Sequence, residues 1–281
     1  MKKKHLLVTF SLFLLIGCAT NQVTGRKQLN IVSNSQLFPQ SFAAYEKTIQ
    51  SEKLSTNAEY NLQVKRVGVK IQRAVEKFFT DIKKPEILEG YKWDYNVLES
   101  EQLNAWCMPG GKVAFYTGIL PVCKNDVGVA VVMGHEIAHA IANHGAERMS
   151  QAQIQGTLGA LGVTAMGMNN VSDETINIVL QAYGIGSELG MLSYSRKHES
   201  EADEMGLIFM ALAGYNPSEA PNFWLRMDAK SKASGSQAPP QFLSTHPHHD
   251  TRVSHLNELM PVAMEVYKTR SIKPYTDYKK K

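Results

Sequence analysis

The stretch from Val132 to His144, "VMGHEIAHAIANH", places chemically active side chains in an apolar segment. If this stretch is helical, His135 and His139 share one face, because residues four apart lie one turn apart. Their imidazole nitrogens can then reach a single metal ion at about 2.0–2.1 Å. Glu136 lies one residue round the turn, close enough to reach a water molecule at the metal. The HExxH pattern therefore indicates a metal centre with a general base beside it.

A hydrolytic metal centre needs a third protein ligand, and zinc suits a set of imidazoles and a carboxylate. The stretch from Ser195 to Gly206, "SRKHESEADEMG", offers Glu199 and Asp203 four residues apart. In a helix Glu199 can bind the metal while Asp203 fixes the ring of a ligating histidine through its second nitrogen. Glu201 would be turned away. The same acidic residues also suit a solvated helix start, and taken alone they leave both interpretations open.

Helices and a few strands must position these side chains. Apolar residues at three- and four-residue steps predict most of the helices. The predicted helices begin near residue 35 and cover residues 57–82, 126–149, 195–213, 217–230 and 247–260. Residues 91–100 and 112–120 are rich in aromatic and β-branched residues, and the turn "PGG" precedes the second segment, so a small antiparallel sheet or hairpin is expected. The predicted fold class is α+β, mostly α-helical, with a small sheet beside the HExxH helix.

The composition of two segments predicts how they pack in the protein. The segment from residue 126 to 149 begins apolar on every side, which predicts a buried helix and places its histidines inside the protein. Residues 151–192 contain many glycines among apolar residues. Loosely packed helices or a mobile cover over the site would both account for them.

The N-terminus resembles a bacterial lipoprotein leader. Residues 1–17 combine three lysines with an apolar run too short to span a bilayer, as in a secretory signal. The following "LIGC" resembles a lipobox, in which Cys18 is lipidated; ordinary cleavage or a structural cysteine are the alternatives. Ala19 in place of aspartate resembles lipoproteins sent to the outer membrane. These features predict a periplasmic protein, lipid-anchored to the outer membrane of a Gram-negative bacterium.

The same features divide the chain into four predicted parts. They are a signal peptide over residues 1–17, a lipid anchor and polar tether over 18–34, a metallopeptidase domain over 35–262, and a basic, solvated tail over 263–281.

The net charge and the cysteines give further information about possible partners and the state of the thiols. The formal charge of +4 falls to +1 without residues 1–17, which carry three lysines and no acid, so the basic character does not indicate nucleic acid. Cys107 and Cys123 remain as an even pair in an oxidising compartment. They could form a disulfide or stay as two buried thiols, and the thiol of Cys107 could instead lie near the site and compete for metal.

These motifs together resemble a known family. HExxH followed by ExxxD in the form "ESEAD", with "NAWCMPGG" upstream and "STHPHHDTR" downstream, resembles the zinc metallopeptidases of the HtpX and CAAX prenyl protease type, in particular their periplasmic lipoprotein branch. The resemblance covers nearly the whole chain after the leader. It implies a gluzincin-type domain with one zinc ion held by His135, His139 and Glu199, Glu136 as general base and Asp203 in support.

The resemblance also assigns residues further along the chain. It implies that His246 and Arg252 flank the zinc as oxyanion-stabilising or substrate-positioning groups. In related lipoproteins the histidine matching His246 can instead occupy the open zinc position and hold the enzyme off. His144 matches a histidine that recurs after HExxH and is expected to be a structural hydrogen-bonding residue. Cys107 stands where the family often has a plain apolar residue.

The expected function is zinc-dependent endoproteolysis. An unfolded or misassembled protein substrate would add as an extended strand to the sheet edge near residues 105–108 through backbone hydrogen bonds. The resemblance alone implies quality control of envelope proteins such as outer-membrane β-barrels, with membrane contact through the lipid and the outer-membrane assembly machinery as a candidate partner. The alternatives are a zinc-containing, chaperone-like assembly factor for outer-membrane proteins with little turnover, and a zinc-dependent peptidoglycan hydrolase.

Overall fold

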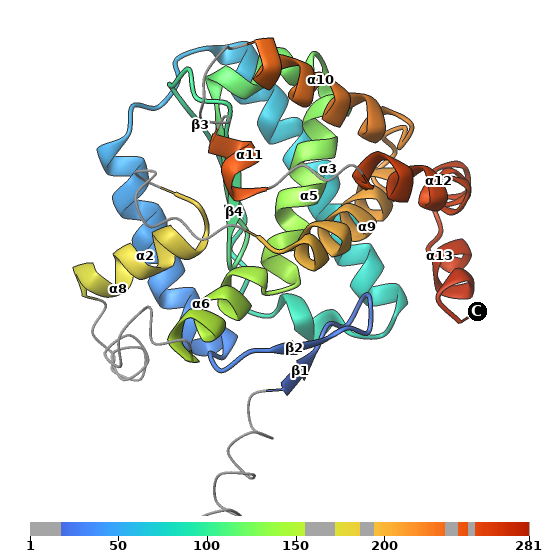
Figure 1. The fold of residues 1–281 in the computed structure, drawn as a ribbon, viewed down its shortest axis with the longest axis horizontal. Coiled ribbons are helices and arrows are strands. Elements are labelled where there is room, and N and C mark those ends of the chain that lie inside the picture. Colours follow the sequence, from blue (N-terminus) through green and yellow to red (C-terminus); the bar gives the residue numbers. More distant parts are fainter. Residues whose placement is uncertain (1–17, 155–171, 186–193, 234–240, 247–250, 281) are drawn as a thin grey trace, which may run out of the picture.

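A pair of helices forms the centre of the fold. The computed structural model describes residues 18–154, 172–185, 194–233, 241–246 and 251–280 (Figure 1). Helices α5 (Asp126–Ile141) and α9 (Arg196–Leu212) pack along each other, and α3 (Ala58–Asp81) contacts both. Helix α12 (Arg252–Thr269) packs on α9, and α10 (Glu219–Ala233) packs on α5 and α12. The predicted mostly helical α+β fold is confirmed.

A three-stranded sheet lies beside α5. Strands β3 (Asp94–Leu98), β4 (Ala105–Met108) and β5 (Lys112–Tyr116) have the order β3-β5-β4. The hairpin between β4 and β5 is antiparallel, and its turn contains two glycines with φ near +80°, a region that favours glycine. The predicted antiparallel pairing of residues 91–100 with 112–120 is wrong, because β3 and β5 run parallel. After β3 the chain forms β4, and β4 is the strand that pairs antiparallel with β5.

The sheet is buried on both faces. Successive side chains in a strand point to opposite faces, and here the alternation divides the apolar residues between two cores. One core includes α3 and α5 residues together with Val97, Ala105, Cys107, Val113 and Phe115. The other includes residues of α2 (Asn34–Ser51) and α8 (Asp173–Ala182) together with Leu98, Trp106, Met108, Ala114 and Tyr116. Figure 1 shows the strands between α2 and α5. Packing on both sides fixes the sheet relative to α5.

Two predicted helices begin at capping residues. The side chain of Asn57 accepts a hydrogen bond from the backbone N–H of Tyr60 at the start of α3, and the side chain of Ser195 accepts from His198 N–H at the start of α9. Such caps satisfy backbone donors that have no partner within the helix. No helix in the described ranges is both long and apolar enough to cross a membrane.

The helix predicted over residues 126–149 is two helices. Helix α5 ends at Ile141 and α6 (His144–Ile154) begins three residues later. Between them Asn143 has φ +56°, in the left-handed region that asparagine tolerates better than most residues and that stops an α-helix. The chain therefore turns just after the HExxH segment. His144 becomes the first residue of α6.

The segment predicted as a polar tether is a packed hairpin. Strands β1 (Cys18–Thr20) and β2 (Lys27–Leu29) pair antiparallel, and β2 contacts α6. Asn21 and Gln28 are buried. Polar composition suggested solvation, but these side chains find polar and charged partners inside the protein. Lipidation of Cys18 stays a prediction, and the leader over residues 1–17 lies outside the described residues.

The predicted C-terminal tail is also packed. The helix predicted over residues 247–260 is α12, which continues past Pro261 to Thr269, and α13 (Lys273–Tyr278) follows. Tyr275 is buried with its ring 6.1 Å from that of Phe78. Apolar residues at helical spacing thus outweigh the basic composition of the segment. The remaining short elements are η1 (Pro85–Leu88), η2 (Thr117–Ile119), α4 (Leu120–Cys123) and α11 (Gln241–Thr245).

Candidate metal centre

Four buried side chains converge between α5 and α9. His135 and His139 come from α5, Glu199 from the first turn of α9, and His246 from the residue after α11, and one ligand atom from each lies within 4.8 Å of the others. The Nε2 atoms of His135 and His139 are 3.0 Å apart. Each Nε2 is 3.5 Å from an oxygen of Glu199. The structure therefore brings together the three predicted ligands.

The spacing of this group and the ionisation states of His139 and Glu199 fit a metal ion. Two ligands of one tetrahedral zinc ion, each about 2.0–2.1 Å from it, lie about 3.3 Å from each other. The measured separations of 3.0–3.5 Å bracket this value. Burial holds the pKa of His139 well below its usual range, which leaves a neutral imidazole. Burial alone would raise the pKa of Glu199, but His246, Arg252 and the two imidazoles hold it well below its usual range, so it is a carboxylate.

His246 lies in the ligand group itself. Its Nδ1 is 3.1 Å from Glu199 Oε1 and 3.3 Å from His135 Nε2. Its ring stacks on that of Phe242, with ring centroids 4.5 Å apart, and burial lowers its pKa to about 4. A neutral imidazole at this place can serve as a fourth ligand. Of the two roles expected for His246, this geometry matches occupation of the open position.

Asp203 supports the first imidazole as expected. Its Oδ1 is 3.0 Å from His135 Nδ1, which directs the Nε2 of the same ring toward the other ligands. Arg252 holds Asp203 in turn, with its Nε and Nη2 donating to the two carboxylate oxygens at 2.6 and 2.7 Å. The carboxylate of Asp203 is thus fixed on both sides.

Arg252 is placed behind the ligands. Its Nη1 is 3.0 Å from Glu199 Oε2, and its guanidinium carbon is 3.4 Å from the ring centre of Trp224. The side chain is almost fully buried. Its charge is already engaged by the carboxylates of Glu199 and Asp203. This geometry matches a residue that orients ligands better than one that binds an oxyanion.

Glu136 lies beside the group without belonging to it. Its Oε1 is 3.5 Å from His246 Nε2 and makes no hydrogen bond within the part of the chain that the structure describes. Burial raises the pKa of Glu136 to about 8, despite the opposing charge of His135. A carboxyl group with a pKa near neutrality can both accept and return a proton. Glu136 therefore lies beside the ligand group, where the general base was predicted, and its role in the reaction stays a prediction.

Two glycines let α5 and α9 approach closely enough to form the site. A Cβ built on Gly206 would lie 2.8 Å from His135 N, and one built on Gly134 would lie 2.8 Å from Gly206 O. Real Cβ atoms do not approach backbone so closely. The backbones of the two helices therefore touch beside His135, which brings Glu199 and Asp203 within reach of its ring.

We expect Gly206→Ala to force these helices apart and lower the free energy of unfolding by about 1–3 kcal/mol. Urea unfolding of the metal-free protein measures the change. Ser200→Ala, on the exposed side of α9, is the matched control and should change stability by less than about 0.5 kcal/mol. Equal stability of Gly206→Ala and wild type would show that the close contact is not needed.

Several residues near the site were not anticipated. Tyr194 stacks on the ring of His139, with centroids 3.8 Å apart. Glu201, expected to be turned away, is buried and lies 2.9 Å from His144 Nε2. A helical-wheel projection correctly predicts that Glu201 points away from the metal. It cannot show that another segment of the protein covers that side of the helix.

Cys107 and Cys123 are buried free thiols, so the proposed disulfide is not formed. Cys107 lies on β4 and its thiol points to the backbone oxygen of Met108 at 3.5 Å. Burial raises the pKa of both thiols, which disfavours the reactive thiolate. The glycine-rich segment, for which loosely packed helices or a mobile cover were both considered, falls mostly on residues 155–171 and 186–193, outside the described residues.

Such a site defines a metallopeptidase, because HExxH on a buried helix supplies two ligands and an adjacent carboxyl group for hydrolysis. Residues 65–260 match Peptidase family M48, and the chain therefore belongs to this family. The predicted enzyme class, a metalloendopeptidase, is confirmed by this match and by relatives named as metalloendopeptidases.

The sequence is similar to several characterised proteins, of which three are described by name, identity and coverage. It is 33% identical to mitochondrial metalloendopeptidase OMA1 of Saccharomyces cerevisiae over 235 residues, which are 82% of this chain and 65% of that protein. It is 28% identical to mitochondrial metalloendopeptidase OMA1 of Homo sapiens over 261 residues, 92% of this chain and 48% of the human protein. It is also 28% identical to the β-barrel assembly-enhancing protease of Escherichia coli over 176 residues, 60% and 35% of the two chains. The chain thus spans less than two-thirds of the length of each relative.

The comparisons overturn the predicted location. An outer-membrane lipoprotein of a Gram-negative bacterium was expected from residues 1–18, but relatives that are 33% and 35% identical are mitochondrial proteins of eukaryotes. A lysine-rich start, a short apolar run and one cysteine are few features on which to assign a compartment. The predicted lipoprotein branch is weakened likewise, because the bacterial relative is less similar than the yeast protein.

Proposed function

We propose that this chain is a zinc-dependent endopeptidase that cleaves unfolded or misassembled proteins. The observation that carries the proposal is the convergence of two imidazoles and a carboxylate from a second helix, with the carboxyl group of Glu136 beside them. Imidazole and carboxylate ligands at tetrahedral spacing suit zinc among the common metals. One zinc ion would be held by His135, His139 and Glu199.

When bound, zinc supplies a Lewis acid that polarises a peptide carbonyl and makes water acidic enough to attack at neutral pH. The chain's own residues do the remaining work. Glu136 accepts a proton from the attacking water and returns it to the leaving amine nitrogen. Asp203 and Arg252 keep the His135 ring and the Glu199 carboxylate in place throughout.

Recognition of substrate backbone would use the edge of the sheet. Strand β4 is the edge strand next to α5, so an extended peptide can add there through main-chain hydrogen bonds without a sequence requirement. All four β4 residues are 2% exposed or less. Because these residues are buried and His246 lies in the ligand group, a substrate strand could pair with this edge only after the atoms that cover it move.

Metal removal tests the proposal directly. Purified full-length protein should contain one zinc ion per chain and cleave an unfolded casein substrate. A chelator should abolish cleavage, and added zinc should restore it. Protein that binds no zinc, or that cleaves equally well after chelation, would contradict the proposal.

His246→Ala tests whether the fourth position is blocked by the protein. We expect faster cleavage of casein, because the ring that occupies the ligand group and contacts Glu136 is removed. The rate under saturating substrate gives the measurement. Zinc content should be retained, since three ligands remain. A loss of cleavage with zinc retained would instead make His246 a participant in the reaction.

The position of His246 in the ligand group favours a second candidate function. In this case the protein is an assembly factor that binds other proteins with little turnover. The relative from Escherichia coli is itself named as both assembly-enhancing and a protease. The two functions separate in a Glu136→Gln variant. If that variant still relieves an assembly defect in cells that lack the wild-type protein, binding carries the function; if it does not, proteolysis does.

A further inference from the structure

The two imidazoles of the metal centre are supported in different ways. His135 Nδ1 contacts the carboxylate of Asp203 directly. His139 Nδ1 instead lies 2.8 Å from Nδ1 of a second imidazole, His144, whose Nε2 is 2.9 Å from Glu201 Oε2. The support of His139 therefore passes through His144 to a carboxylate on the far side of α9.

The donors and acceptors in this series of hydrogen bonds, from His139 through His144 to Glu201, are consistent with one direction of donation. A histidine that binds metal through Nε2 carries its proton on Nδ1, so His139 donates to His144 Nδ1. His144 then carries its own proton on Nε2 and donates it to Glu201. The His144 ring also stacks on that of His198, with centroids 4.6 Å apart and planes 22° apart. All three imidazoles are buried, so the rings have little room to turn.

Glu201 is held by the N-terminal hairpin. Arg26 Nε lies 2.5 Å from Glu201 Oε2, and the hydroxyl of Thr24 donates to Glu201 Oε1. Arg26 also donates to both oxygens of Glu147 on α6, with Nη2 2.6 Å and Nη1 3.1 Å away. His198 Nε2 contacts the same carboxylate at 3.0 Å. One arginine thus fixes two carboxylates that flank the His144 and His198 rings.

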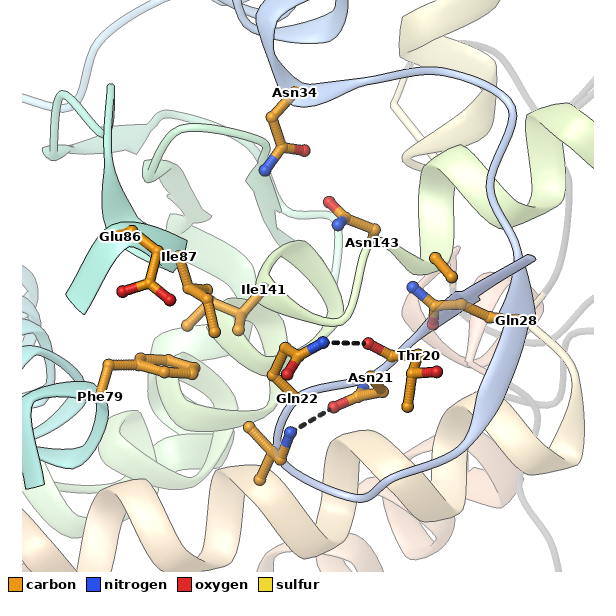
Figure 2. A pocket seen from close by; sticks show the side chains of 12 residues that line it. Thr20, Asn21, Gln22, Gln28, Asn34, Phe79, Glu86, Ile87, Ile141 and Asn143 are labelled. Atoms are coloured by element: carbon orange, nitrogen blue, oxygen red, sulfur yellow. Dashed lines mark hydrogen bonds between the residues drawn. The ribbon is translucent and has the colours of Figure 1, made fainter. Parts of the chain in front are cut away.

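Polar contacts are a large part of what attaches the hairpin. A pocket of about 220 Å³ separates its turn from the end of α5, with Asn21 and Gln22 on one side and Ile141 and Asn143 on another (Figure 2). Val23 of the hairpin packs on the apolar core, and this pocket interrupts the packing around it. The ion pairs of Arg26 bind the hairpin to α6 and α9.

We propose that the N-terminal hairpin is part of the metal centre: Arg26 acts through Glu201 and His144 to position the His139 ring, so that hairpin docking and metal binding are coupled. The inference rests on the proposed zinc site. His144, Glu201 and Arg26 are positioning residues, and none of them touches the metal or the substrate. Coupling of this kind is reciprocal, so metal binding must also stabilise the docked hairpin.

Zinc affinity of the metal-free protein, measured by competition with a chelator, tests the coupling without relying on cleavage. His144→Leu should weaken zinc binding about 10–100-fold, the usual cost of losing a supporting residue. His144→Asn should recover part of this loss, because an amide oxygen near the Nδ1 position can still accept from His139. Arg26→Gln should weaken binding about 10-fold. Lys27→Gln, at the next and exposed position of the hairpin and with the same charge change, is the matched control and should bind like wild type.

A double variant distinguishes one pathway from two. If Arg26 acts through His144, the Arg26→Gln/His144→Leu protein should bind zinc no more weakly than His144→Leu alone. Multiplied losses would overturn the pathway. Hydrogen exchange gives a second measurement: zinc should slow exchange of the amides of residues 18–29 in wild type and Lys27→Gln, and should slow it less in Arg26→Gln.

The outcomes separate this inference from the proposed function. If wild type binds zinc and both His144→Leu and Arg26→Gln bind it with wild-type affinity, the coupling is wrong and the zinc peptidase stands. If wild type binds no zinc, the proposed function fails, and the coupling fails with it. Should His144→Leu not fold, Arg26→Gln against Lys27→Gln still decides the question.

Discussion

Glu136→Gln is expected to reduce casein cleavage by about 10²–10⁴-fold, the contribution of a general acid–base group. The amide keeps the size of the side chain but cannot accept a proton from water. Because Glu136 lies outside the ligand group, zinc content should not change. Initial rates and metal analysis on the same preparation give both measurements.

Glu258→Gln is the control for this change, since it makes the same substitution at an exposed position of α12. It should leave both rate and zinc content unaltered. Undiminished cleavage by Glu136→Gln would remove this residue from the reaction. Loss of zinc along with cleavage would indicate a structural role for the carboxyl group.

Glu199→Ala should have the largest effect on the metal. It removes the one carboxylate among the ligands, so zinc affinity should fall by more than the roughly 10–100-fold expected for a supporting residue. Cleavage should be lost with it. Equilibrium dialysis against buffered zinc measures occupancy, with Glu258→Ala as control.

The buried groups around Glu199 add a second expectation. Arg252 keeps its pair with Asp203, but its Nη1 loses the contact with Glu199, and a buried donor left without a partner destabilises a protein. Glu199→Ala should therefore also unfold at lower urea concentration than Glu258→Ala when both are metal-free. Full zinc occupancy in Glu199→Ala would refute the proposed ligand set.

Local patterns were sufficient to predict the central residues of the site. His135 and His139 are four residues apart, as are Glu199 and Asp203, and helical geometry alone brings each pair to one face. That the second pair meets the first required the family resemblance, since a contact between α5 and α9 has no local signal. The small size of Gly206 indicated a close approach, but only the fold shows that Gly134 of α5 is the residue it meets.

Features that depend on distant partners were missed for the same reason. Arg26 and Glu201 are 175 residues apart in sequence, and nothing local distinguishes Arg26 from a solvated charge. The parallel pairing of β3 with β5 depends on where the chain runs between them. The break at Asn143 did have a local signal, an asparagine before "HG", but the apolar periodicity on both sides concealed it.

Segments far apart in the sequence bind the same helix. Arg26 of the first hairpin pairs with Glu201 of α9, and Arg252 of α12 pairs with Asp203 of α9. The family match runs only from residue 65 to 260. A recombinant fragment trimmed to those limits would lack Arg26 and the docking of Tyr275. Expression work should therefore begin before Thr24 and extend past α13.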